Sequence, residues 1–437
     1  MSNAQDEIAD NRARSQTDTA ITLARLKYSD PTSQAAPILP YKTGNGIVAF
    51  GKLRMLYIFK GRQQKWKSAF KNPSGKLALK VGVPESKNRY VQNFKGHTDG
   101  VWHVCTAKIG SFNVLASASA DQTAKIWMVE NGSQPLVNYS AHNGSVNSVA
   151  IRSEGARNTY SECHVYSQPT FLTCSGDRSS HIWRVNFDKI SEIHQNENES
   201  QNDELPSLQQ LHQPLIKLTG HSDVVIDGDW LFGGDEIITV SWDRTANLFA
   251  AETGKILRTL SGHDRELTRC SVHPSQKLLA TASRDFTFRL WDFREPIHSV
   301  AVFQGHNEFA IYYNLITRTA YAILSNFYLQ LSNVWDLRNM RSPISAIRLN
   351  IAVNRISICN AKSLLAIPLD NRNIYIYDMN GSRMTRIPRN SGKCHHRLVS
   401  ACTWLSDNPL NNLITCGFDK QIIGWRVYLP SSNFSKF

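Results

Sequence analysis

The sequence predicts an all-β fold, a seven-bladed β-propeller that follows a flexible, basic N-terminal segment. Three recurring features predict it: a pair of a small residue and a histidine, an aspartate in a predicted turn, and an aromatic residue that ends the next strand. The period is about 40 residues, which is typical of a repeated four-stranded sheet. One such sheet cannot bury both of its faces, so we expect the copies to stack around an axis.

The N-terminal segment, residues 1–88, carries most of the net charge of +13, because its basic residues are concentrated in 42–90. Trp66 and Phe70 interrupt this basic run. A solvated linker is one interpretation. Contact with an acidic protein, a nuclear-import signal and contact with nucleic-acid phosphates are the others. The propeller is predicted to span 89–430.

The cysteines indicate the compartment. The chain has 8 of them, none in a CxxC pair, and we recognise neither a secretory signal nor an apolar stretch of membrane-spanning length. Free thiols persist in reducing compartments, so we expect the protein in the cytoplasm, the nucleus or both. No cofactor is expected.

The recurring residues are expected to form one hydrogen-bonded network in each regular blade. A loop histidine faces a hydroxyl group and the turn aspartate, and the aromatic residue packs beside them, so that polar groups between stacked sheets are paired. The sets are His97, Ser117, Asp121 and Trp127; His142, Thr173, Asp177 and Trp183; His221, Thr239 and Asp243; His263, Thr281, Asp285 and Trp291; and His395, Thr415, Asp419 and Trp425.

The number of blades and the ring closure follow from the strand ends. Seven aromatic residues mark them: Trp127, Trp183, Phe249, Trp291, Trp335, Tyr377 and Trp425. The Gly-His pair lies between the outer strand of one blade and the inner strand of the next. Residues Tyr90–Lys95 are therefore predicted to be the outer strand of the last blade, which removes an exposed sheet edge.

Some stretches depart from the repeat. Insertions at 157–167 and 188–214 lengthen blade 2, and the acidic, Asn- and Gln-rich second insertion is expected to be a disordered surface loop. Blade 5 is irregular at 307–333, which contains no turn aspartate. A wrongly predicted or retained coding segment is one explanation, and genuine divergence is the other. Blade 6 lacks the histidine and has Asn371 in place of the aspartate.

These motifs resemble the WD40 family, since Gly262-His263 and Trp291-Asp292 match its Gly-His and Trp-Asp signature. Four longer runs also resemble the WD repeat-containing protein 37 family: Gly262–Arg294, Trp242–Leu248, Trp335–Pro343 and Cys416–Trp425. This resemblance covers most of 94–430 and fails across 307–333. It implies a noncatalytic adaptor of cytoplasm and nucleus whose partners are the phosphofurin acidic-cluster sorting proteins.

Catalytic and metal chemistry are not expected. Histidine, hydroxyl and aspartate recur in five places, as structural repeats do, and no GxSxG elbow, phosphate-binding loop or zinc motif occurs. Cys394, His395 and His396 are adjacent, but neighbours in sequence seldom converge on one ion. We therefore predict a scaffold and not an enzyme.

Partner-binding residues are expected on the propeller face that carries the Gly-His loops. Exposed aromatic and arginine side chains anchor interfaces, which favours Trp102, Trp242, Arg284 and Phe418. The alternative is that Trp102 and Trp242 only pack between blades. A second candidate is the basic cluster Arg383, Arg386, Arg389 and Arg397, on the strand and loop that enter blade 7.

Two other functions stay open. Trp291-Asp292-Phe293-Arg294 resembles the box that docks substrate receptors on the adaptor of the cullin-4 ubiquitin ligase. Such boxes are common in WD repeats by descent, so the ligase receptor is the alternative to the scaffold. Nucleic-acid binding through residues 42–90 is the third hypothesis.

Overall fold

The computed structural model describes residues 88–109, 112–130, 132–152, 169–187, 208–273, 275–294, 301–304, 310–315, 321–326, 331–336, 345–349, 351–359, 362–387, 392–405, 408 and 411–428. In this part of the chain the regular elements are short β-strands, rich in β-branched and aromatic residues and bounded by turn residues.

The strands are β1 (Arg89–Phe94), β2 (Val101–Ile109), β3 (Phe112–Ser119), β4 (Ala124–Met128), β5 (Val137–Tyr139), β6 (Val146–Ile151), β7 (Thr170–Ser175), β8 (Ser180–Arg184), β9 (Gln209–Leu211), β10 (Ile216–Leu218), β11 (Val225–Trp230), β12 (Glu236–Ser241), β13 (Ala246–Ala250), β14 (Ile256–Leu260), β15 (Leu267–Val272), β16 (Leu278–Ser283), β17 (Thr287–Asp292), β18 (Ala301–Gln304), β19 (Ala310–Leu315), β20 (Tyr321–Asn326), β21 (Leu331–Asp336), β22 (Ser345–Arg348), β23 (Ser357–Cys359), β24 (Leu364–Pro368), β25 (Ile374–Asp378), β26 (Arg383–Arg386), β27 (Val399–Trp404), β28 (Leu413–Gly417) and β29 (Ile422–Arg426).

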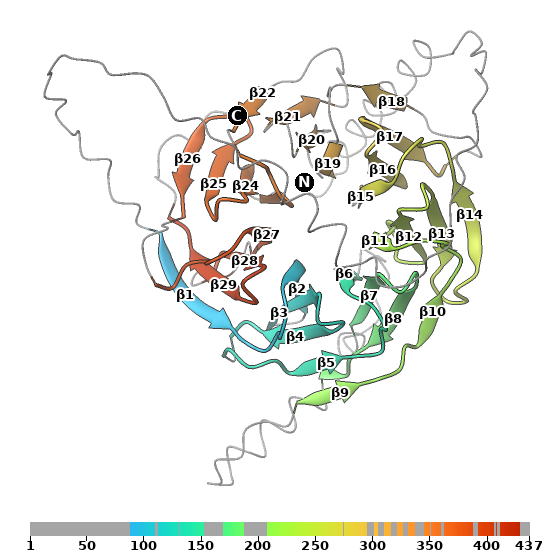
Figure 1. The fold of residues 1–437 in the computed structure, drawn as a ribbon, viewed down its shortest axis with the longest axis horizontal. Helices are drawn as coiled ribbons and strands as arrows, with labels where there is room; N and C mark the ends of the chain where they lie inside the picture. The colour runs from blue at the N-terminus through green and yellow to red at the C-terminus, as the bar shows by residue number, and fades with distance from the viewer. Residues whose placement is uncertain are drawn as a thin grey trace, which may run out of the picture. The chain divides into compact units, whose positions relative to one another are not determined.

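The sheets lie side by side around a common centre (Figure 1). The sheets are antiparallel, except for one added parallel strand, β9. In the sheet that joins the two ends of the propeller, β1 is the outer strand and β27 lies at the opposite edge. The inner strands β27, β2, β6, β11 and β15 contact one another in turn, β15 also contacts β19, and β27 contacts β23. This is the all-β propeller that the repeats predict.

The structure corrects the predicted fold class in two respects. Six sheets are blades with described side chains and packed cores; their strands are β2–β5 with β9, β6–β8 with β10, β11–β14, β15–β18, β23–β26, and β27–β29 with β1. The stretch expected as blade 5 pairs its backbone as β19–β22, but the side chains of β19, β20 and β21, including Trp335, lie outside the described residues. Six packed blades are therefore established, not the seven counted from aromatic strand ends. The flexible basic segment has no support either, because residues 1–87 lie outside the described part.

The two ends of the propeller meet in one sheet. Strand β1 pairs antiparallel with β29, and Tyr90 lies opposite Trp425. The prediction that Tyr90–Lys95 supplies the outer strand of the last blade is confirmed, with the strand running from Arg89 to Phe94. Asn88 adds a side-chain link, because its Nδ2 donates to Thr385 Oγ1 at 2.8 Å on β26 of the neighbouring blade.

Part of the long insertion is ordered, which corrects the expectation of a disordered loop across 188–214. Residues 188–207 lie outside the described part, but β9 pairs parallel with β5, the outer strand of the first blade. Leu211 packs against the core of that blade, and its carbonyl oxygen accepts the amide of Ser140 at 2.9 Å. The apolar Leu211 explains the order, because it buries surface that the acidic part of the insertion cannot.

The apolar cores lie between neighbouring sheets. Trp127, Trp183 and Trp425 are fully buried, and their clusters join one blade to the next. The aromatic strand ends thus act as packing residues between blades.

A bulge near the start of the inner strands shapes the centre of the ring. The pairing register shifts between the first and third residues of five inner strands with described side chains: Val101/His103, Val146/Ser148, Val225/Asp227, Leu267/Arg269 and Val399/Ala401. The backbone of β19 shifts in the same way at Ala310/Tyr312. A bulge adds one unpaired residue and bends the strand. His103, Asp227 and Arg269, all third residues, line a central cavity.

Candidate functional site

The blade around β15–β18 shows the recurring network in full. Nδ1 of His263 lies 2.7 Å from Oδ2 of Asp285, and Nε2 lies 2.8 Å from Oγ1 of Thr281. Nε1 of Trp291 donates to the same Oγ1 at 2.8 Å. The hydroxyl therefore accepts from the indole and donates to Nε2, and Nδ1–H donates to the carboxylate. In this chain of hydrogen bonds both imidazole nitrogens, the hydroxyl, the indole and the carboxylate all have a partner.

The structure brings together the other four predicted sets in the same way. The distances from His Nδ1 to Asp and from His Nε2 to the hydroxyl are 2.8 and 2.6 Å for His97, 2.9 and 2.9 Å for His142, 2.8 and 2.8 Å for His221, and 3.0 and 2.9 Å for His395. Their partners are Asp121 and Ser117; Asp177 and Thr173; Asp243 and Thr239; and Asp419 and Thr415. Trp183 and Trp425 also donate to the hydroxyl, at 3.3 and 2.9 Å.

The turn aspartates hold both the loop and the hairpin. Asp243 accepts from the backbone amide of Ser222 at 3.0 Å and from both the amide and the hydroxyl of Thr245, at 2.9 and 2.7 Å. Burial alone would raise the pKa of Asp243, but the hydrogen bonds from His221 and Thr245 outweigh it and lower that pKa to about 2. The pKa values of Asp121, Asp177, Asp285 and Asp419 are lowered by the same balance. These carboxylates stay ionised and structural.

Two blades depart from the repeated pattern of hydrogen bonds. Nε1 of Trp127 is buried and has no hydrogen-bond partner among the described residues. Where the β23–β26 blade lacks the histidine, Asn354 donates to Asp370 at 2.8 Å and to the carbonyl of Val399 at 2.8 Å. The side chain of Asn371 still accepts from the amide of Asn373 at 3.1 Å. Asn354 thus links this blade to the inner strand of the next one, as Asn147 does through the carbonyl of Val225 at 2.7 Å, and none of its described hydrogen bonds reaches the turn residue Asn371.

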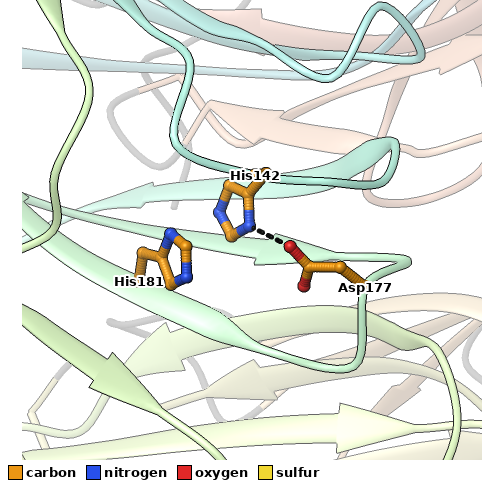
Figure 2. Close-up of side chains that lie close together, drawn as sticks. All are labelled: His142, Asp177 and His181. Carbon is orange, nitrogen blue, oxygen red and sulfur yellow. Dashed lines mark hydrogen bonds and ion pairs between the residues drawn. The ribbon is translucent and has the colours of Figure 1, made fainter.

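One cluster that the sequence analysis missed has the residue types of a metal site. His142, Asp177 and His181 place their ligand atoms within 4.8 Å of one another (Figure 2). However, the two imidazole rings are stacked, with centroids 3.8 Å apart and an interplanar angle of 8°. Imidazole lone pairs lie in the ring plane, so parallel rings cannot both point to one ion.

The hydrogen bonds of the same cluster give these nitrogens another role. His181 lies 2.9 Å from Tyr139 Oη and 3.1 Å from Ser179 Oγ through its two nitrogens. His142 uses both of its nitrogens in the repeat network. Burial and then the neighbouring His142 lower the pKa of His181 to about 3. The arrangement fits a stacked, hydrogen-bonded histidine pair within the blade better than a metal centre. Of the adjacent residues weighed as ligands, Cys394 is buried, His395 belongs to its blade's network and His396 is exposed.

The four predicted anchors pair up between neighbouring blades. The rings of Trp102 and Phe418 meet edge to face at 4.4 Å, and the guanidinium carbon of Arg284 lies 5.4 Å from the ring centroid of Trp242. All four side chains are half-buried. These contacts agree with the packing alternative for both tryptophans, while the remaining exposed surface leaves the binding hypothesis open.

The predicted basic cluster is divided among different elements. Arg383 and Arg386 are exposed on β26, and the Arg383 guanidinium carbon lies 5.4 Å from the ring centroid of Tyr375. Arg397 is exposed in the loop before β27, and Arg389 lies outside the described residues. Among the described residues of this cluster, only Arg397 lies in a loop that corresponds to the Gly-His loops of the other blades.

A row of basic side chains at the hairpin turns was not predicted from the sequence. The residue after each turn Asp or Asn has a positive φ, which is uncommon outside glycine. Exposed basic residues hold this position in four blades: Arg178 (φ 70°), Arg244 (φ 73°), Arg372 (φ 71°) and Lys420 (φ 67°). The His–Asp bonds place these turns at the same end of the sheets as the Gly-His loops. Each of these basic residues directly follows the turn Asp or Asn, so the row could have been predicted from the sequence.

The polar residues at the centre of the ring were also missed. Asp227 accepts from Ser148 at 2.5 Å, and it pairs with Arg269 at 3.1 Å and with Arg355 at 3.4 Å. His103, Ser148, Asp227 and Arg269 each stand six positions after a loop histidine. That spacing was visible, but which of these side chains meet was not.

No helix in the described part of the chain is long and apolar enough to cross a membrane. The family model "WD domain, G-beta repeat" matches residues 88–128, 133–184 and 254–292.

Comparison with known proteins finds close relatives. The chain is 41% identical over 362 residues to the WD repeat-containing protein 37 of Homo sapiens, which covers 78% of this chain and 69% of that protein. The proteins of the same name in Mus musculus and Xenopus laevis are 41% and 40% identical, with the same coverage. A ribosome biogenesis protein WDR12 homolog of Drosophila erecta is 25% identical over 294 residues, 64% of each chain. With its propeller, its repeat networks and this identity, the chain belongs to the WD repeat-containing protein 37 family.

Proposed function

We propose that the chain is a noncatalytic scaffold that binds an acidic protein partner on the face carrying the Gly-His loops and hairpin turns. The observation that carries this proposal is the charge of that face. Among its described residues the exposed bases are Lys95, Arg178, Arg244, Arg265, Arg372, Lys393, Arg397 and Lys420, and the exposed acids are Asp223 and Asp264. A positive patch on a rigid ring attracts an acidic surface at little ordering cost.

The chemistry of the described side chains supports a noncatalytic role. The recurring histidines use both ring nitrogens in structural hydrogen bonds. Burial raises the pKa of the Cys105, Cys174 and Cys416 thiols, that of Cys416 to about 12, so these thiols stay protonated. These groups are therefore built into the fold and are not poised as nucleophiles.

The family resemblance makes the phosphofurin acidic-cluster sorting proteins our first candidate partners. A partner that presents an acidic surface would match the basic face, and Trp242 with Arg284 would add a half-buried anchor to it. We also propose the cytoplasm and the nucleus as its location, which the free cysteines of the described residues support.

Charge reversal tests the proposed face. The double variant Arg244→Glu with Arg372→Glu should weaken binding to a recombinant phosphofurin acidic-cluster sorting protein by at least about tenfold, because like charges then meet. The matched control is Lys255→Glu with Lys362→Glu, an equal charge change in turns at the opposite end of the sheets. Equal binding by both double variants would contradict the proposed face.

The same capture experiment separates the other two functions. The ligase-receptor hypothesis requires capture of the cullin-4 adaptor and its loss on Arg294→Ala. In the structure, Arg294 forms an ion pair of 2.7 Å with Asp292 of the same repeat. The nucleic-acid hypothesis requires an affinity that falls steeply with salt and depends on residues 42–90.

A further inference from the structure

The centre of the ring encloses a polar cavity of about 300 Å³. The walls are formed by inner strands β2, β6, β11, β15 and β27 and by the segment at Arg355–Ser357. Of the described side chains in this wall, four carry formal charge: Asp227, Asp229, Arg269 and Arg355. Ligand binding in this cavity does not require the scaffold function proposed for the face that carries the Gly-His loops and hairpin turns.

A buried carboxylate organises one end of the cavity. Asp227 is 1% exposed and lies between two guanidinium groups, at 3.1 Å from Arg269 and 3.4 Å from Arg355. Ser148 also donates to it at 2.5 Å, and the backbone amide of Cys270 does so at 3.4 Å. Asp227 is thus saturated by protein donors, and it holds Arg355 at the cavity wall.

Arg355 has donor groups to spare. A guanidinium carries five N–H donors, and among the described residues its only side-chain partner is Asp227, at the long distance of 3.4 Å. The Arg355 side chain is 20% exposed, which is more than that of Arg269 at 10%. The backbone of Arg355 is fixed by its amide, which donates to the carbonyl of Ser400 at 3.1 Å. A fixed, partly exposed guanidinium is a typical binding group for a carboxylate or a phosphate.

The net charge of the cavity restricts the charge that a ligand can carry. The two arginines contribute two positive charges, and Asp227 offsets one. Burial and then Arg269 hold the pKa of His103 well below its ordinary value, so that imidazole is neutral. The remaining group is Asp229, and burial raises its pKa to about 7.

The groups around Asp229 explain its raised pKa. It is faced by Asp227 on its own strand, by the Cys105, Cys174 and Cys270 thiols, and by the amides of Trp230 and Val272. When Asp229 is protonated, the cavity has a net charge of one positive unit. A single negative charge neutralises it, whereas a dianion would leave excess buried charge.

We propose that the central cavity binds a monoanionic carboxylate, which Arg355 holds through N–H donors that Asp227 does not engage, in a wall that also contains Ser357 and Thr403. The carboxylate can come from a small free acid or from an acidic side chain that a partner inserts. Both sources share the same chemistry and are separable by experiment. A cation is disfavoured, since it would face two guanidinium groups.

Trifluoroacetate is a suitable probe, because it is a small monoanion from pH 6 to pH 8 and is observed by ¹⁹F NMR. The full chain should broaden the probe signal in a saturable way. Arg355→Gln should weaken binding by about tenfold, because it removes a charged hydrogen-bond donor. Ser357→Leu, which fills the cavity without changing its charge, should weaken it as well. The matched control, Arg184→Gln, removes an exposed arginine at the end of β8, outside the cavity, and should bind like the wild type.

The pH profile gives an independent readout. If binding requires a protonated Asp229, affinity should fall by about tenfold from pH 6 to pH 8. Asp229→Asn should remove this dependence and keep the binding. Displacement by acetate indicates a small free acid as ligand, and displacement by an end-blocked triglutamate peptide indicates an inserted side chain. Absence of saturable broadening, or equal binding by wild type, Arg355→Gln and Ser357→Leu, would overturn the proposal.

Discussion

Nε1 of Trp291 lies 2.8 Å from Oγ1 of Thr281, and this contact makes Thr281 a relay between an indole and an imidazole. In the first blade the corresponding Trp127 is equally buried, yet its Nε1 has no hydrogen-bond partner among the described residues. The same residue type at the same repeat position thus stabilises its blade by packing alone in one case, and by packing and hydrogen bonding in the other.

Replacement of the two tryptophans by phenylalanine should separate these contributions. Both changes remove similar apolar area, but Trp291→Phe also removes a buried donor from Thr281. We expect Trp291→Phe to lower the free energy of unfolding by about 1–2 kcal/mol more than Trp127→Phe does. Urea unfolding followed by circular dichroism measures this difference. Equal losses would show that the indole hydrogen bond contributes nothing net.

The network around Asp243 should be structural. Asp243→Ala removes the acceptor of His221, of the Ser222 amide and of Thr245. Breaking a buried pair by removing one partner costs about 3–5 kcal/mol, so the midpoint of thermal unfolding should fall clearly. The exposed Asp264 provides the control, and Asp264→Ala should leave that midpoint nearly unchanged. An unchanged midpoint for Asp243→Ala would refute the network as a source of stability.

The lowered pKa values of the turn aspartates predict acid sensitivity. A carboxyl whose pKa in the folded state lies below its unfolded value stabilises the fold above the unfolded pKa, and this stabilisation is lost as the pH falls through the folded pKa. For Asp243 the two values are about 2 and about 3.9. Its contribution, about 2–3 kcal/mol, should therefore disappear between roughly pH 5 and pH 1.

Unfolding free energies of wild type and Asp243→Asn over this range check that contribution. The gap between them should shrink as the pH is lowered. A constant gap would mean that ionisation of Asp243 does not stabilise the fold.

Strand β9 should protect the edge of the first blade. The amide of Ser140 donates to the carbonyl of Leu211, and the amide of Gln209 donates to that of Leu136. Leu211→Asp places a charge against the apolar cluster that Leu211 covers, which is costly. Hydrogen–deuterium exchange should then show faster exchange at Ser140. Gln210→Asp, at an exposed position of the same strand, is the control, and similar exchange in both variants would argue against a covering role.

The repeated motifs by themselves determined the propeller, because each one has its parts close together in sequence. A loop histidine, a hydroxyl and a turn aspartate recur at constant spacing, and this spacing is sufficient to predict which side chains meet within a blade. The pairing of β1 with β29 followed from the order of the strands around the Gly-His pair. The blade count of seven was wrong, because Trp335 was counted by pattern alone.

Only the tertiary structure decided what meets at the centre and at the rim. Asp227 and Arg355 are 128 positions apart, and they meet because both line the central cavity, Asp227 from the bulged strand β11 and Arg355 from the segment before β23. The parallel pairing of β9 with β5 is a similar case. Strand β9 lies in sequence between β8 and β10 of the second blade, but it pairs with the first blade. Such contacts depend on the curvature and closure of the ring. These are sums of many small strand twists and packing contacts, and no local pattern of residues records them.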